Sequence, residues 1–218
     1  MAGTTYTALR DRAEALLLDS TNARFTTATL DEGFQQALVH FSRVVPHEVL
    51  ANITLAADGR EIDISSITEY VNILRVWWDY DSSDPTHPPN WRSFEIWPGD
   101  ILYINDANEP VTDDVVRVHY TAIHTLNGLN SETVTTLPNL YDTTLVQGAA
   151  AYAALIRAIS RTEKLNIDGW TPRRLNDWGN TLLKQFTDAL KAIARQRAAR
   201  ASGVIQAPAL DRWDGRGW

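Results

Sequence analysis

The strongest constraint on the fold is a run of small residues at 148–154, where Gly and Ala are interrupted only by Tyr152. Around this run, apolar residues recur at alternating steps of four and three, as on the packing seam of a helix: Leu145, Ala149, Tyr152, Ile156 and Ile159. Small side chains let a second backbone approach closely. We therefore expect one face to lie against another helix, either the next one along the chain or one from an adjacent subunit, through Gly148, Ala150, Ala153 and Ala154.

Apolar residues at helical spacing predict two helical hairpins, one in residues 1–47 and one in residues 138–202. In the first hairpin, Thr29 and Glu32 predict a capping box at the start of its second helix. In the second hairpin, Asp142 is the expected N-cap of the first helix. The final helix, at roughly 30 residues and ~1.5 Å per residue, would span about 45 Å, which is more than a compact domain of this size requires.

Between the hairpins, residues 48–137 lose the helical period and become rich in β-branched and aromatic residues. Turn signals divide this region into six predicted strands at 49–56, 61–64, 73–80, 94–97, 101–105 and 115–124. Residues 203–218 show no period and predict an extended arm. The expected fold class is therefore α+β. We expect a four-helix bundle of two N-terminal and two long C-terminal helices, with a β-rich insertion and an extended C-terminal arm.

The sequence contains no recognisable catalytic or metal-binding pattern. It has no cysteine, which excludes disulfides and thiolate metal sites, and it lacks the GxSxG, GxxxxGK[ST], HExxH and GxGxxG motifs. Asp79, Asp81 and Asp84 are spaced like the start of a calcium loop, but Asp84 and Asn90 stand where an EF-hand needs Gly and a bidentate Glu. We expect no catalytic residue, no metal and no cofactor.

Charge is distributed unevenly along the chain. Residues 1–156 carry 8 Lys and Arg against 21 Asp and Glu, a net −13, whereas residues 157–218 carry 12 against 6, a net +6, which together give the −7 of the whole chain. This division predicts either two surfaces with different partners or a solvated, self-complementary monomer. The last helix has a basic face that suits an acidic protein surface better than duplex DNA, formed by Lys184, Lys191 and Arg195.

Aromatic residues point to surfaces that meet other molecules. Trp77 and Trp78 are adjacent in a predicted strand, so they face opposite sides, and one of them must leave the core or be covered. The arm at 203–218 combines Trp and Arg, which dominate binding hot spots, and we expect it to order on a partner through Arg212, Trp213, Arg216 and Trp218.

Four stretches carry a family likeness: TNARFTTATL at 21–30, WPGDILYI at 97–104, TTLP at 135–138 and LVQGAAAYAAL at 145–155. Together with the order of elements, they resemble the head-tail adaptor (connector) proteins of tailed bacteriophages. The resemblance implies a structural virion protein without enzymatic activity. It also implies a homo-oligomeric ring, typically a dodecamer, at the head-tail junction beneath the portal.

The same resemblance implies a portal protein as partner on one side, a stopper or tail protein on the other, and passage of double-stranded DNA through the channel. The arm would reach onto the portal. The protein would be found in the host cytoplasm during assembly and in the virion neck afterwards, without a membrane partner. The predicted β-rich insertion is longer than in the smallest adaptors, so its role and orientation stay open.

Two other functions fit parts of the sequence. A carbohydrate-binding module would use the Trp-rich β region as a sugar platform, and a nucleic-acid-binding protein would use the basic C-terminal helix. No stretch is apolar enough for a membrane span and the N-terminus has no apolar signal segment, so we expect a soluble, unexported protein.

Overall fold

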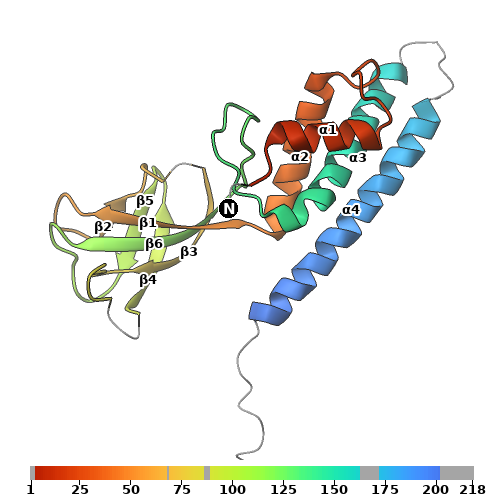
Figure 1. Ribbon diagram of the computed structural model, residues 1–218. Helices are drawn as coiled ribbons and strands as arrows, with labels where there is room; N and C mark the ends of the chain where they lie inside the picture. Colours follow the sequence, from red (N-terminus) through yellow and green to blue (C-terminus); the bar gives the residue numbers. More distant parts are fainter. Residues whose placement is uncertain (1–2, 68, 86–88, 163–171, 202–218) are drawn as a thin grey trace, which may run out of the picture. The chain divides into compact units, whose positions relative to one another are not determined.

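The structure, a computed structural model, describes residues 3–67, 69–85, 89–162 and 172–201 (Figure 1). The chain forms two compact units. The helical unit combines the residues up to Val45 with those from Thr125 onward, and the β unit is formed by Pro46–His124. The β unit therefore interrupts the helical unit in sequence.

The helical unit is organised around one central helix. Its elements are α1 (Tyr6–Leu16), α2 (Thr27–Val44), the short 3-10 helix η1 (Asn139–Tyr141), α3 (Asp142–Thr162) and α4 (Pro172–Ala201). Helix α3 packs against α1, α2 and α4, and α1 lies across α2 and α3 (Figure 1).

The predicted four-helix bundle with a β-rich insertion is wrong. In the described residues, the α+β fold consists of four α-helices that are only partly bundled and a curled six-stranded antiparallel sheet. The 11 residues of α1 span about 16 Å at ~1.5 Å per residue, too little to run along the 21 residues of α3 or the 30 of α4. Because α1 crosses its neighbours, only α2, α3 and α4 share a long packing direction.

The start of α2 differs from the sequence prediction. The N-cap is Thr26, three residues before the expected Thr29, and the Thr26 hydroxyl accepts a hydrogen bond from the Thr29 amide at 3.3 Å. Thr29 is therefore inside the helix, where its hydroxyl lies 2.9 Å from that of Thr26.

The carboxylate of Asp142, the expected cap of α3, has a tertiary role. It accepts a hydrogen bond from the Thr4 hydroxyl at 2.7 Å and lies 3.4 Å from the Arg12 guanidinium. Asp142 thereby ties the N-terminal segment and α1 to the start of α3.

The small residues of α3 lie between α2 and α4. A Cβ atom built on Gly148 would meet the Phe186 ring of α4 at 2.8 Å, and Ala149, Ala150, Ala151, Ala153 and Ala154 are fully buried. The small face is thus covered by helices of the same chain, leaving none of these alanines for an adjacent subunit. Ile159, predicted on the same seam, is instead 73% exposed.

The closest approach involves Gly33 of α2. A Cβ atom at this position would lie 2.6 Å from the carbonyl oxygen of Ala149 and 3.2 Å from the amide nitrogen of Ala153. These are backbone atoms of α3, which cannot rotate away as a side chain can. Gly33 therefore permits α2 and α3 to pack backbone to backbone.

Residues 125–137, assigned by the sequence to the β-rich region, belong to the helical unit. Leu126, Leu129 and Leu137 are buried in the helical core, and the Tyr6 amide donates to the carbonyl of Asn127 at 3.0 Å. The segment contains no helical or alternating pattern from which its burial in the helical core could be predicted.

The β unit is an open, curled antiparallel sheet of six strands: β1 (His47–Thr54), β2 (Glu61–Asp63), β3 (Tyr70–Trp77), β4 (Trp91–Trp97), β5 (Ile101–Asn105) and β6 (Val115–Ala122). All six overlap the predicted strands. Their order in the sheet is β1-β6-β3-β4-β5-β2, which makes β1 and β2 the edges.

The sheet encloses its own core on one face. Its ten buried members are Leu55, Ile62, Ile64, Ile67, Val76, Trp78, Leu102, Ile104, Val116 and Val118. Trp78 satisfies its indole N–H by donating to the Asp114 carboxylate at 2.9 Å. Trp77 belongs to neither of the two hydrophobic cores, as expected for adjacent strand residues, yet only 8% of its surface is exposed.

His119 of β6 lies on the same face as Trp77. Burial lowers the pKa of its imidazole, and the nearby guanidinium groups of Arg117 and Arg75 lower it further, whereas Glu48 acts in the opposite direction. Folding therefore favours the neutral form of His119.

Substitution of Gly33 by Ala tests the backbone contact. The added methyl group meets the α3 backbone, so we expect Gly33→Ala to lower the free energy of unfolding by about 1 to 3 kcal/mol, despite the better helix propensity of Ala. Gly179→Ala is the matched control, because the nearest atom there is a Leu155 side-chain methyl at 3.0 Å that can move. Urea unfolding compares the two. Equal effects of the two substitutions would contradict the contact.

Acid should destabilise the β unit through His119. The pKa of His119 is lower in the folded state than its ordinary value of about 6.5. Its contribution to the free energy of unfolding is therefore fully present above about pH 6.5 and is lost as the pH falls below that value. We expect His119→Gln to flatten this decrease in urea unfolding followed by tryptophan fluorescence. His40→Gln, at an exposed position of α2, is the control. A pH dependence unchanged by His119→Gln would refute the assignment.

Candidate functional site: an apolar pocket of the helical unit

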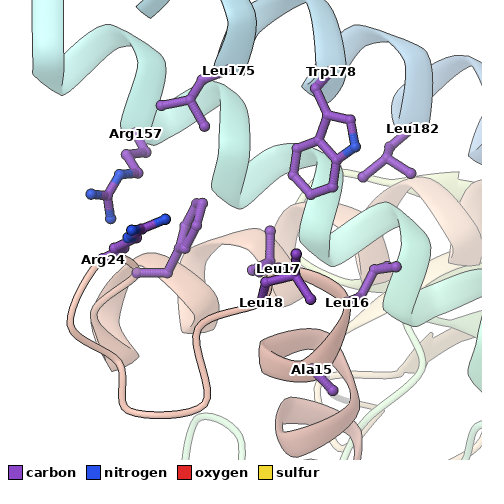
Figure 2. Close-up of a pocket in the computed structure, with 10 residues that line it drawn as sticks. Ala15, Leu16, Leu17, Leu18, Arg24, Arg157, Leu175, Trp178 and Leu182 are labelled. Carbon is purple, nitrogen blue, oxygen red and sulfur yellow. The ribbon is translucent and has the colours of Figure 1, made fainter. Parts of the chain in front are cut away.

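A cavity of the helical unit lies where the α1–α2 loop meets α3 and α4 (Figure 2). Its volume is about 390 Å³, within the range of small-ligand sites. The lining residues are Ala15, Leu16, Leu17, Leu18, Arg24, Phe25, Arg157, Leu175, Trp178 and Leu182.

A buried carboxylate shapes the loop that forms one wall. Asp19 is 4% exposed and accepts hydrogen bonds from the backbone amides of Ala23, Arg24 and Phe25 at 3.2, 2.7 and 2.6 Å. These three bonds hold the turn that follows α1, in which Leu18 adopts a positive φ of 52°. Asp19 was not among the residues selected from the sequence, although an Asp at the end of a helix followed by Ser, Thr and Asn is typical of such a turn.

Helix α4 supplies the opposite wall through Leu175, Trp178 and Leu182, whose spacings of three and four residues place them on one helical face. The same face of α4 continues into the helical core through Phe186 and Leu190. The pocket is therefore an extension of the core seam that the described side chains do not fill.

The pocket has a cationic end. The guanidinium of Arg157 lies 4.8 Å from the centroid of the buried Phe25 ring, and Arg24 is the neighbour of Phe25 in sequence. Figure 2 shows Arg24 and Arg157 at one end of the pocket and Trp178 and Leu182 at the other. The described residues of the lining include no carboxylate, so the cavity is suited to an apolar group that carries, or lies beside, a negative charge.

The same lining argues for binding rather than chemistry. Among the described residues that line the pocket there is no Asp, Glu, His, Ser, Thr, Tyr or Lys, so none of these side chains is a usual nucleophile or general base. Within the part of the chain that the structure describes, no group of three or more His, Cys, Asp or Glu residues could hold a metal ion.

The residues predicted for close packing lie apart from this pocket. Ala150, Ala153 and Ala154 are in the helical core, Gly148 is buried against Phe186, and none of the four lines the pocket. They hold α3 in place and present no surface to a partner.

The predicted basic face is on the exposed side of α4. Lys184, Lys191 and Arg195 are exposed, and Lys191 pairs with Asp188 at 3.3 Å. Lys191 also lines a shallow depression of about 300 Å³ together with His40 and Arg43 of α2. The predicted arm residues lie outside the described residues: Arg212, Trp213, Arg216 and Trp218.

Comparisons with known proteins provide no assignment. No protein-family model matches the chain, and a comparison with curated proteins finds no match. Among the described helices, none is long and apolar enough to cross a bilayer.

The pocket should bind an amphipathic anion without prior unfolding. We expect anilinonaphthalene sulfonate to fluoresce on the native protein, because its rings fit the apolar walls and its sulfonate meets Arg24. Since Arg24 is exposed, Arg24→Ala should weaken binding by about twofold to fivefold. Lys184→Ala, an exposed cation that does not line the pocket, is the control. Equal binding by the two variants would place the dye elsewhere.

Proposed function

We propose that this chain is a structural protein of tailed bacteriophages that forms a ring-shaped head-tail adaptor beneath the portal. It links the portal to a stopper or tail protein and lets double-stranded DNA pass through the ring. The virion neck is its proposed location, and the ring is proposed to be a dodecamer that assembles in the host cytoplasm.

The observation that carries this proposal is the reach of α4 beyond its own core. Core packing along α4 runs from Leu175 to Ile193, whereas the helix continues to Ala201. Of the side chains described after Ile193, none belongs to the helical core. An amphipathic helix that projects in this way, with exposed cations, supplies a surface for another chain.

Three further features support an assembly role. The sequence resembles head-tail adaptors at 21–30, 97–104, 135–138 and 145–155. The pocket offers an apolar anchor site whose described lining includes no catalytic groups. The net charge of −7 disfavours tight DNA binding, which suits a channel that must release its DNA.

The carbohydrate alternative gains no support from the aromatic side chains. The Trp97 ring stacks on Tyr103 with centroids 4.4 Å apart, and the Arg75 guanidinium lies over the Trp91 ring at 5.3 Å. The exposed tryptophans of the β unit are thus each partly covered by a neighbour and do not offer the free, coplanar faces of a sugar platform.

Electron microscopy of the protein mixed with the portal protein of the same phage tests the proposal. We expect a ring of additional density on the tail-facing side of the portal. Reversing two charges of the basic face in Lys191→Glu/Arg195→Glu should abolish or greatly reduce that density. The pair Arg173→Glu/Arg174→Glu, exposed at the other end of α4, is the matched control and should retain it.

Adding duplex DNA to a separate sample of the protein, in a gel-shift experiment at increasing salt, tests the alternative of a nucleic-acid-binding protein. Tight binding of duplex DNA that weakens steeply with salt, together with no density on the portal, would contradict the adaptor proposal and favour a nucleic-acid-binding protein.

A further inference from the structure

The sheet of the β unit has a second, unusual face. In β6, Val118 belongs to the core, so its strand neighbours Arg117 and His119 lie on the opposite face, and the same holds in β3 for Val76 and Trp77. The strand register then brings side chains of this opposite face together, because Trp77 pairs directly with Arg117 of β6.

Aromatic and cationic groups on this face form one contact network. The Trp91 ring lies 5.7 Å from that of Trp77 and 4.9 Å from that of His119, both in edge-to-face geometry. The guanidinium of Arg75 lies 5.3 Å from the Trp91 centroid. Tyr80 packs against Trp77, and the guanidinium of Arg117 lies 3.5 Å from the centroid of the Tyr80 ring. We refer to these residues as the outer cluster: Arg75, Trp77, Tyr80, Trp91, Arg117 and His119.

The two guanidinium groups are exceptional in their electrostatic setting. Residues 46–124 carry 14 Asp and Glu against 4 Arg, a net charge of −10. Of the four arginines, Arg92 pairs with Asp106 and Arg60 donates to a backbone carbonyl. Within the described ranges, neither Arg75 nor Arg117 forms an ion pair, although carboxylates are abundant in the unit.

Both groups instead rest on aromatic rings. A guanidinium stacked on a ring keeps N–H donors at its edge, where they are directed away from the ring. Arg117 uses one of them to bind Asn52 at 2.8 Å. The remaining donors are suited to a carboxylate, which guanidinium recognises with two parallel hydrogen bonds.

The cluster contains one more unused donor. Trp77 is 8% exposed, and its indole nitrogen has no hydrogen-bond partner among the described residues. A buried donor without an acceptor is unfavourable, because it has lost its hydrogen bond to water. Arg75, Trp77 and the remaining N–H groups of Arg117 therefore have no carboxylate partner among the described residues.

We propose that the outer cluster is a docking surface for a protein segment that presents a carboxylate beside an apolar side chain. The carboxylate binds Arg75 and Arg117, and the apolar side chain contacts Trp91 and Leu50, which is 53% exposed and pairs with His119 in the register of β1 and β6. Trp, Tyr and Arg are the residue types that dominate protein–protein hot spots. The inference does not rest on the adaptor proposal.

Charge favours a partner protein over two other occupants. A nucleic acid would bring many phosphates to a unit with a net charge of −10, and a second copy would bring another β unit of the same charge. A short segment with one or two carboxylates engages the two arginines with much less repulsion.

Nuclear magnetic resonance of the indole N–H groups tests the proposal on the full-length protein. The probe is a blocked tetrapeptide of alternating Leu and Asp, with the Leu/Asn peptide as its uncharged match. We expect the Asp peptide, and not the Asn peptide, to cause saturable chemical-shift changes of the Trp77 and Trp91 indole signals. Trp→Phe variants assign these signals. Arg75→Gln/Arg117→Gln should weaken binding at least about tenfold, as loss of a charge-assisted pair implies.

Arg60→Gln, in the same unit but outside the cluster, should bind like the unmodified protein. If the double variant does not fold, Arg75→Gln alone, at an exposed strand position, provides the comparison. Equal shifts with the Asn peptide, no shifts, tighter binding of a thymidine oligonucleotide, or Arg75-dependent self-association in sedimentation would each overturn the proposal.

Discussion

The near contact of two backbones at Gly33 is the interaction on which the helical unit depends. Because Gly33 of α2 has no Cβ atom, α2 lies directly against the carbonyl of Ala149 in α3. On the other side, Gly148 accommodates the Phe186 ring of α4. Together these contacts fix α2 and α4 on opposite sides of α3. The loop that leads into α2 is thereby held beside α3 and α4, where the pocket forms.

The pocket and the outer cluster combine the same kinds of side chain, although they belong to different units. In each, apolar or aromatic groups lie against guanidinium groups. In the pocket, the Asp19 carboxylate accepts hydrogen bonds from three backbone amides, and Arg24 and Arg157 form the cationic end. In the outer cluster, Arg75 and Arg117 rest on aromatic rings. Both surfaces are consequently suited to partners that are apolar and locally acidic.

Periodicity in the sequence was sufficient to locate local elements and insufficient to assemble them. The six strands and the long α4 were predictable, because alternation and helical spacing are local signals. The bundle prediction failed because the crossing of α1 depends on where its short face packs. Residues 125–137 were misassigned because the burial of Leu126, Leu129 and Leu137 depends on distant helices. The roles of Gly33 and Asp19 could not be predicted for the same reason, because each depends on a tertiary or loop contact that residue spacing does not encode.

The central claim is that the helical unit presents a preformed surface that another chain covers in an assembled particle. Hydrogen exchange followed by mass spectrometry, on the isolated protein and on phage particles containing it, measures this directly. The account predicts that backbone amides of residues 15–25 and 175–182, which line the pocket, exchange more slowly in the particle. Identical exchange of both segments in the two states would contradict it.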